Sequence, residues 1–208
     1  MILVLGGGGH ARVVIDALRQ LSRVPFGIID PNLPAGSEVY GIPVLGGDEV
    51  VASYHPDDVE LVNAVGSTHL PFRRRNLFDR FAKLGYKFAS VIHPAAVVAP
   101  DVVLGAGVQV MAGAVVQSGA VLGDNVLINT KASVDHGSHV GAHTHVAPGA
   151  TICGEVRIGE GSLIGSGAVI IQGIEIGSGV VVGAGSVVVS HVADNTQVLG
   201  VPARVVRR

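Results

Sequence analysis

A repeat of six residues between Val98 and Val192 constrains the fold of this chain more than any other feature of its sequence. Every sixth residue from Val98 to Val188 is Leu, Ile or Val, in sixteen units without an insertion. A second, mostly smaller residue lies two positions before each of these aliphatic residues from Leu104 onward. Because residues two apart in an extended chain point to the same side, each unit sends a large and a small side chain inward. Such short repeats predict a β-helix, in which each coil covers its neighbour.

The corners between the units are marked by glycine. Ten of the sixteen units carry Gly three residues after the aliphatic residue, where a corner favours the positive φ that glycine adopts easily. This pattern resembles the hexapeptide-repeat acyltransferases, whose left-handed parallel β-helix has triangular coils of three hexapeptides. The resemblance implies eighteen residues in a coil and a little over five coils, and it alone supplies the handedness and the triangular section.

The composition agrees with a solenoid that small aliphatic side chains fill. Hydrophobic residues make up 48% of the 208 residues, but aromatic residues only 4%, and there are 30 glycines. The formal charge of −2 gives no reason to expect nucleic acid or an anionic membrane surface as a partner.

No part of the sequence predicts export or membrane insertion. The N-terminal run from Met1 to Leu5 is apolar, but it has no basic region and leads into glycines, which indicates a strand. No apolar run approaches the roughly 20 residues that span a bilayer. The single cysteine, Cys153, excludes an intrachain disulfide and favours a reducing compartment. We therefore expect a cytoplasmic protein.

The chain before the repeat alternates short apolar segments with amphipathic ones. Strands are expected at residues 2–5, 26–29 and 60–65, an extended segment at 41–46, and helices at 11–23 and around 77–84. This alternation predicts a small parallel sheet covered by helices. The expected organisation is an α/β Rossmann-like half domain at 1–90, followed by an all-β left-handed parallel β-helix at 91–208.

A glycine-rich loop follows the first expected strand. Gly6-x-Gly8-x-x-Ala11, with Asp30 further on, fits a dinucleotide-binding fingerprint and taken alone suggests NAD. The roughly 90 residues before the repeat suffice for only one mononucleotide-binding half. The glycines let the backbone approach a phosphate at a helix N-terminus, and Asp30 can accept hydrogen bonds from a sugar or base. A sugar nucleotide fits both ends; a glycine-rich turn without a ligand is the alternative.

Four of the nine histidines lie between residues 136 and 145. Side chains stack on one face of such a β-helix when they are eighteen residues apart, and no two histidines have that separation. We therefore expect no metal site built within one protomer; zinc shared with a second protomer is the alternative. We expect His139, in the middle of a face, and His143, at a corner, to be polar surface residues.

An ordered set of motifs carries a closer resemblance. Gly8-Gly9-His10, Asn129 seven residues before His136, His145 nine residues after it, and a terminal Gly200-Val-Pro-Ala203 resemble the sugar-nucleotide acetyltransferases of the NeuD and PglD type. The resemblance covers essentially the whole chain. It implies an acetyl-CoA-dependent N-acetyltransferase acting on a nucleotide-linked amino sugar, with the site in a groove between adjacent subunits of a homotrimer.

The same resemblance assigns residues to roles. His136 is implied as the general base, which suits the chemistry, because the attacking amine must lose a proton and histidine titrates near the working pH. For the sugar nucleotide it implies a pocket lined by Gly8, Gly9 and His10, with Asp30 and Gly66 near the base and ribose. For acetyl-CoA it implies Asn129, His145 at the thioester, and Ser166 and Ala184 beside the pantetheine arm.

One departure from the family pattern concerns the orientation of His136. The family usually follows this histidine with Asp or Glu, but here the next residue is Gly137, at a corner that favours glycine. Asp135, which we group with His136 as catalytic, precedes it, and adjacent strand residues tend to point to opposite sides. Asp135, a backbone carbonyl or a neighbouring subunit could orient the ring. Two other functions stay open: sugar O-acetylation of the sialic acid type, and a catalytically silent nucleotide-binding or assembly protein.

Overall fold

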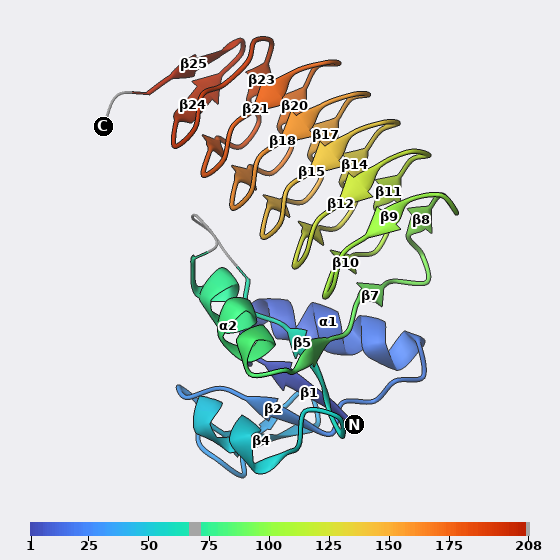
Figure 1. The fold of residues 1–208 in the computed structure, drawn as a ribbon, viewed down its shortest axis with the longest axis vertical. Coiled ribbons are helices and arrows are strands. Elements are labelled where there is room, and N and C mark those ends of the chain that lie inside the picture. Colours follow the sequence, from blue (N-terminus) through green and yellow to red (C-terminus); the bar gives the residue numbers. More distant parts are fainter. Residues whose placement is uncertain (67–71, 207–208) are drawn as a thin grey trace.

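The computed structural model describes residues 1–66 and 72–206 of the chain. Figure 1 shows a small part made of a sheet and helices at one end, with a tall stack of short strands above it. The stack is a left-handed parallel β-helix, and the part below it is α/β, which confirms the predicted fold class.

The N-terminal sheet has six strands in the order β3-β4-β2-β1-β5-β6. All neighbours in this sheet are parallel except β3 and β4, as the alternation of strands and helices predicts. The strands and helices of this part are β1 (Ile2–Leu5), α1 (Gly9–Gln20), β2 (Gly27–Ile29), β3 (Glu38–Val39), β4 (Ile42–Gly46), the 3₁₀ helix η1 (Asp48–Ser53), β5 (Glu60–Asn63), α2 (Phe72–Lys83) and β6 (Lys87–Phe88).

Helices cover both faces of this sheet, which explains the continuous apolar sequence of β1. Ile2 and Val4 pack into a core that includes the buried side of α1, whereas Leu3 and Leu5 pack into a core with residues of α2 and η1. The helix α1 ends earlier than expected at 11–23, because Ser22 adopts a positive φ of 56° and closes the last turn.

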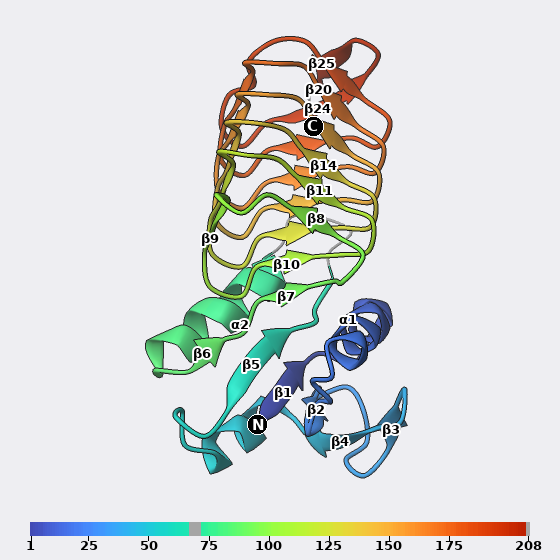
Figure 2. The ribbon, with the colours of Figure 1, turned by 90° about the vertical axis from the view of Figure 1, so that its right-hand side faces the viewer.

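The β-helix consists of two-residue strands joined by turns, and Figure 2 shows them as stacked rungs. Each strand pairs with the strand eighteen residues later, for example Val110 with Ile128, so three hexapeptides make one coil. The strands are β7 (Val91–Ile92), β8 (Val97–Val98), β9 (Val103–Leu104), β10 (Gln109–Val110), β11 (Val115–Val116), β12 (Val121–Leu122), β13 (Leu127–Ile128), β14 (Ser133–Val134), β15 (His139–Val140), β16 (His145–Val146), β17 (Thr151–Ile152), β18 (Arg157–Ile158), β19 (Leu163–Ile164), β20 (Val169–Ile170), β21 (Glu175–Ile176), β22 (Val181–Val182) and β23 (Val187–Val188).

Three sheets form the sides of the prism, which we call faces 1, 2 and 3. Face 1 contains β7, β10, β13, β16, β19 and β22, and ends in the antiparallel pair β24 (Gln197–Gly200) and β25 (Ala203–Val205). Face 2 contains β8, β11, β14, β17, β20 and β23, and face 3 contains β9, β12, β15, β18 and β21. We name the edges by the faces that the chain joins there: edge 1–2, edge 2–3 and edge 3–1.

The interior of the prism confirms the predicted pattern. The second residue of each strand points inward, and from Val110 onward these aliphatic side chains are buried together with the smaller residues that precede them. The glycines of the repeat corners have φ between 64° and 74°. Four corners instead carry a residue other than glycine with φ between 56° and 62°: Asn125, Lys131, His143 and Glu155. The corner therefore tolerates a side chain.

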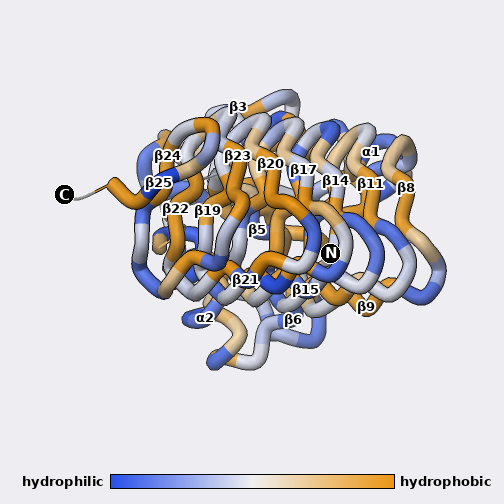
Figure 3. The backbone as a smooth tube through the Cα atoms, turned by 90° about the horizontal axis from the view of Figure 1, so that it is seen from above, coloured by the Kyte–Doolittle hydropathy of each residue, from blue (hydrophilic) through white to orange (hydrophobic). Residues whose placement is uncertain are grey.

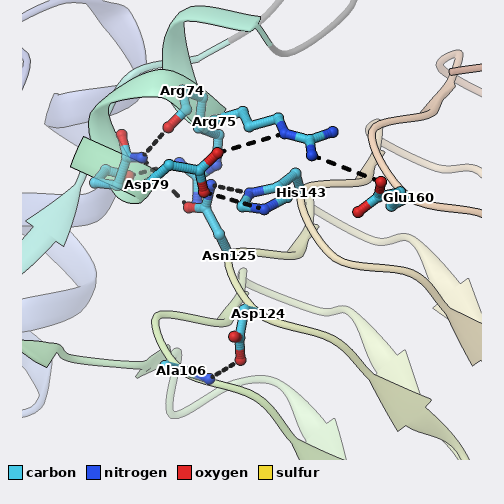
Figure 4. Close-up of polar contacts among 9 residues, drawn as sticks. Arg74, Arg75, Asp79, Ala106, Asp124, Asn125, His143 and Glu160 are labelled. Atoms are coloured by element: carbon cyan, nitrogen blue, oxygen red, sulfur yellow. Dashed lines mark hydrogen bonds and ion pairs between the residues drawn. The ribbon is translucent and has the colours of Figure 1, made fainter. Parts of the chain in front are cut away.

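The helix α2 packs along edge 3–1, and this contact overturns one expectation. His143 was expected on the surface, but it is only 7% exposed. Its Nε2 lies 3.5 Å from Asp79 Oδ1 and its Nδ1 is 3.1 Å from Asn125 Nδ2 (Figure 4). Phe78 packs edge-on against its ring. Burial lowers the pKa of His143 in spite of the opposing attraction of Asp79.

Two kinds of feature are absent from the described residues. No helix in residues 1–66 and 72–206 combines the length and hydrophobicity that a membrane crossing requires. Within the same ranges, no group of three or more His, Cys, Asp or Glu side chains could hold a metal ion.

Candidate functional site

A cavity of about 450 Å³ lies where the N-terminal part meets face 1 of the β-helix. It is of the size that small-molecule ligands occupy. Both parts of the chain line it, which brings together residues more than a hundred positions apart. The lining residues are Gly6, Gly8, Gly9, His10, Asp30, Ala64, Val65, Gly66, Arg73, Leu127, Asn129 and His145.

The four consecutive glycines divide into two pairs with different roles. A Cβ at Gly7 would lie 2.4 Å from Leu33 and one at Gly6 2.9 Å from Val65, so the first pair packs against the sheet. A Cβ at Gly8 or Gly9 would have no described residue within 4 Å, whereas the first pair is closely packed. Among residues 1–66 and 72–206, no side chain caps the N-terminus of α1 at Gly8. Its first N–H groups therefore suit an anion such as a phosphate.

Asp30 lines the cavity and also holds the glycine loop. Its Oδ2 accepts the Gly7 N–H at 2.8 Å, and its Oδ1 accepts the Asn32 N–H at 2.9 Å. Burial on its own would raise the pKa of Asp30, but these hydrogen bonds and the charge of Arg73 outweigh it and lower the pKa. Asp30 is therefore an anion at neutral pH, with most of its acceptor capacity in use.

His10 is held in one tautomer by a chain of hydrogen bonds. Gln109 Nε2 donates to Asn63 O at 2.7 Å, which turns Gln109 Oε1 toward His10 Nε2 at 2.9 Å. The ring must donate from Nε2, so Nδ1 is left as an acceptor. Burial, with a contribution from the cation of Arg74, lowers the pKa of His10 to about 4. The ring that lines the cavity is therefore neutral at physiological pH.

The low pKa of His10 makes a prediction about stability. Between pH 6.5 and about 4 the unfolded chain protonates this ring and the folded chain does not. The contribution of His10 to the free energy of unfolding should therefore be constant above pH 6.5 and fall by up to about 3 kcal/mol as the pH drops through this window. Urea unfolding followed by circular dichroism at fixed protein concentration measures it. In His10→Gln, the free energy of unfolding should depend less steeply on pH within this window. His143, whose pKa is also lowered, should account for part of the dependence that remains. The same pH dependence in the variant and the wild type would contradict the assignment.

Two arginines at the start of α2 contribute to the site, and the sequence analysis missed them. Arg73 lines the cavity. Arg74 is 1% exposed and donates from Nη1 to Asn63 O at 2.6 Å, while its Nε and Nη2 have no hydrogen-bond partner among the described residues. Burial lowers the pKa of Arg74 to about 9, so it stays a cation at neutral pH. The two cations give the cavity a positive potential that favours an anionic ligand.

Face 1 and edge 1–2 of the β-helix supply the predicted acetyl-CoA residues, with His145 on β16 of the face and Asn129, Ser166 and Ala184 on the edge. Asn129 Nδ2 lies 3.1 Å from His145 Nε2, and both residues line the cavity. Ser166 and Ala184 are exposed on the same edge, in the next coils toward the C-terminal end. The backbone joins these coils, since the Gly185 N–H donates to Ser166 O at 2.9 Å. The edge thus forms a line that leads away from the cavity.

His136 and Asp135 do not reach this cavity. They follow β14, on edge 2–3, whereas Asn129 precedes that strand on edge 1–2. Face 2 separates them by about six extended residues, or roughly 20 Å. His136 is exposed, and a Cβ at Gly154 would lie 2.5 Å from its ring, so this glycine allows the ring to lie against the next coil. Asp135 Oδ1 accepts the His136 backbone N–H at 3.0 Å.

Comparisons with known proteins agree with this architecture. Residues 1–81 match the family described as the PglD N-terminal domain, and residues 155–190 match the bacterial transferase hexapeptide family. The acetyltransferase domain of PglB from Neisseria gonorrhoeae, solved with acetyl coenzyme A, is 40% identical, with a TM-score of 0.92 over 99% of this chain and 98% of that one. The chain belongs to the NeuD/PglD type of sugar-nucleotide acetyltransferases.

Other solved members of this family match the chain over nearly its full length. PerB from Caulobacter crescentus, in complex with CoA and GDP-perosamine, is 37% identical, with a TM-score of 0.91 and coverage of 99% of this chain and 97% of that one. A mutant of the perosamine N-acetyltransferase from the same organism, solved with the same two ligands, is also 37% identical, with a TM-score of 0.93, 100% coverage of this chain and 97% of that one. A search of curated proteins returned no match.

Proposed function

We propose that this protein is an acetyl-CoA-dependent N-acetyltransferase that acetylates the amino group of a nucleotide-linked amino sugar. The cavity carries this proposal, because it joins a phosphate-binding loop at Gly8 and Gly9 to Asn129 and His145 of the β-helix. Relatives that are 37% identical over the whole chain are described as bound to CoA and GDP-perosamine, a nucleotide-linked amino sugar.

The sugar nucleotide enters from the N-terminal part. The N–H groups at the start of α1 and the cation of Arg73 bind the diphosphate. Asp30 and Gly66 border the nucleoside, and the neutral His10 offers its Nδ1 as an acceptor to the ligand. The sugar then lies toward Asn129 and His145. Residues 1–90 thus recognise the nucleotide, and residues 91–208 carry out acyl transfer.

Acetyl-CoA lies along edge 1–2. Its thioester meets Asn129 and His145, and its pantetheine arm follows the edge past Ser166 and Ala184, whose exposed positions leave the backbone accessible. An extended arm fits a linear edge, and the acetyl group arrives at the cavity in which the sugar nucleotide is bound. No metal takes part in this proposal.

In a homotrimer, the proposed general base His136 comes from a neighbouring subunit. The outward residues of face 2 are uncharged, namely Val97, Val115, Ser133, Thr151, Val169 and Val187. Those of face 3 are Val103, Val121, His139, Arg157 and Glu175, so that face includes charged residues. Figure 3 shows the backbone of the strands of face 2 from above, coloured by hydropathy. Three prisms with face 2 toward a common axis bury this uncharged surface. Edge 2–3 of one prism then lies beside edge 1–2 of the next. His136 of one subunit thereby meets the cavity of its neighbour.

The reaction is a direct transfer. The sugar amine attacks the thioester carbonyl carbon while His136 takes a proton from the nitrogen, and the carbon–sulfur bond breaks to release CoA. General-base assistance contributes about 10²–10⁴-fold. Holding both substrates at the junction supplies further acceleration through proximity. Cys153 has no role in this scheme, because no acyl-enzyme forms. We place the protein in the cytoplasm, in accord with its single cysteine.

A thiol-release assay tests this function. With acetyl-CoA and a panel of UDP-, GDP- and dTDP-linked amino sugars, we expect CoA release with at least one nucleotide-linked amine. The matching free amino sugar should react far more slowly, because it leaves the phosphate loop empty. Release with a hydroxyl acceptor and not with the amine would instead indicate O-acetylation. Failure to bind CoA in calorimetry would indicate a catalytically silent protein.

A further inference from the structure

A histidine that acts as a base needs a partner that fixes its ring and tautomer, and His136 has no such partner in its own coil. Asp135 places its Oδ1 on the backbone N–H of His136, at 3.0 Å, rather than on the ring. Gly137 offers no side chain. We therefore expect the group that orients the His136 ring to come from an adjacent coil.

Glu155 lies at the same corner as Gly137, eighteen residues later and one coil further along edge 2–3. Its backbone N–H donates to His136 O at 2.8 Å, so the two residues are fixed next to each other. A Cβ built at Gly137 would lie 3.5 Å from Glu155 Cγ. The side chain of Glu155 thus extends toward the place from which an acid at position 137 would start. Both Glu155 and His136 are exposed, and the His136 ring lies beside Gly154, the residue that precedes Glu155.

Carboxylates at other corners of this β-helix already bond to the adjacent coil. On the same edge, Asp101 Oδ2 accepts the Ser118 hydroxyl at 2.7 Å, and Ser118 is the counterpart of His136 one coil earlier. On edge 3–1, Asp124 Oδ1 accepts the Ala106 N–H at 2.8 Å, which is a contact to the preceding coil. An acid at a corner can therefore reach either neighbouring coil, and glutamate is one methylene longer than aspartate.

We propose that Glu155 is the positioning carboxylate of His136 and takes the place of an acid at position 137. This inference rests on the proposed function. One ring N–H of His136 donates to the Glu155 carboxylate, and the other nitrogen stays unprotonated as the base. No ion pair joins these two described side chains in the structure, and rotation about the torsions of Glu155 forms the contact without a change in the backbone. The charged groups nearest the ring in sequence and coil are Asp135 and Glu155.

Kinetics of matched variants test the proposal. Glu155→Gln should lower kcat by roughly 10- to 100-fold, as losses of orienting partners commonly do, with KM for both substrates changed less than about twofold. Glu175→Gln, an exposed glutamate on face 3, should match the wild type. Moving the acid, in the double variant Gly137→Glu with Glu155→Gln, should restore most of the lost kcat. Position 137 can carry a side chain, because Glu155 itself occupies the equivalent corner at φ 58°.

A spectroscopic readout in the free protein separates orientation from folding. Nitrogen-15 NMR of ring-labelled histidine should show one dominant tautomer for His136 in the wild type and in the double variant. Glu155→Gln should show a mixture of the two tautomers, with the same oligomeric state by light scattering. A role of Glu155 in stability alone would leave the tautomer unchanged, and that result contradicts the proposal.

These experiments distinguish a failure of the Glu155 proposal from a failure of the proposed acetyltransferase function. If Glu155→Gln keeps the wild-type kcat while Asp135→Asn loses it, Asp135 orients the ring and the proposal for Glu155 is overturned. If the wild type acetylates no nucleotide-linked amine, the proposed function itself fails. The tautomer measurement still decides whether Glu155 positions His136 in that case, because it needs no substrate.

Discussion

Replacement of His136 by alanine should lower kcat by about 10²–10⁴-fold, the usual contribution of a general base. The loss should appear in kcat more than in KM, because His136 belongs to the transfer step and not to the cavity that binds the sugar nucleotide. Steady-state CoA release at saturating substrates measures it. The fold should be unaffected, since the side chain is exposed, with its ring beside Gly154.

His139 provides a matched control for this experiment. It is the next histidine along the chain and points outward on β15, on face 3, away from the edges that hold the predicted site. His139→Ala should therefore keep the wild-type kcat. Equal loss in both variants would point to a general effect of these substitutions on the coil, and near-normal activity in His136→Ala would remove His136 from its proposed role.

The β-helix could be predicted from sequence because the repeat of the aliphatic residues directly sets the length of a coil. Each coil repeats every eighteen residues, so one aliphatic series such as Val110, Ile128 and Val146 fixes the register of a whole face. The glycine pattern at the corners was less decisive. The positive φ of Lys131 and Glu155 shows that this corner needs a local backbone shape and not a missing side chain. Gly137 is therefore not explained by the corner alone.

The docking of the N-terminal part on the prism could not be predicted, because no local pattern encodes it. The burial of His143 depends on Asp79 and Phe78 of α2, more than sixty residues earlier. The contact of His10 with Gln109 crosses 99 residues. The family resemblance grouped Asn129 and His145 as acetyl-CoA residues, but it could not show that the glycine loop lines the same cavity. The sequence shows three successive arginines at 73–75, but it does not show which of them lines the cavity, which is buried and which lies on the surface.

The second large effect is expected in mixed trimers that combine two inactive variants. The first of these variants is Gly8→Asp, which should block binding of the sugar nucleotide without disturbing the fold. Aspartate is a preferred N-cap residue, and Gly8 is the N-cap of α1 with ordinary negative φ. No described residue lies within 4 Å of a Cβ at Gly8, so the fold should be kept or stabilised. The same carboxylate would occupy the N–H groups proposed for the diphosphate and repel its charge. We expect Gly8→Asp to abolish saturable binding of the sugar nucleotide while CoA still binds.

Two inactive chains should then restore activity to each other. If each site combines the cavity of one subunit with His136 of the next, a trimer that contains both Gly8→Asp and His136→Ala chains has one complete site in three, whichever chain is in excess. Co-expression with two different tags and purification through both isolates these mixed trimers. They should show about one third of the wild-type kcat per trimer, set by the closed cyclic arrangement. Each variant alone should stay inactive.

The alternative arrangement predicts a different number. If the cavity and the base that serve one substrate came from the same subunit, every chain in the mixed trimer would carry one defect and no site would be complete. Activity would then stay at the level of the single variants. Mixed trimers of doubly substituted and wild-type chains provide a control. If each site is shared between two subunits, a trimer with two wild-type chains keeps one complete site, and a trimer with one wild-type chain keeps none. The distance of roughly 20 Å that face 2 sets between His136 and the cavity is the physical reason to expect the first result.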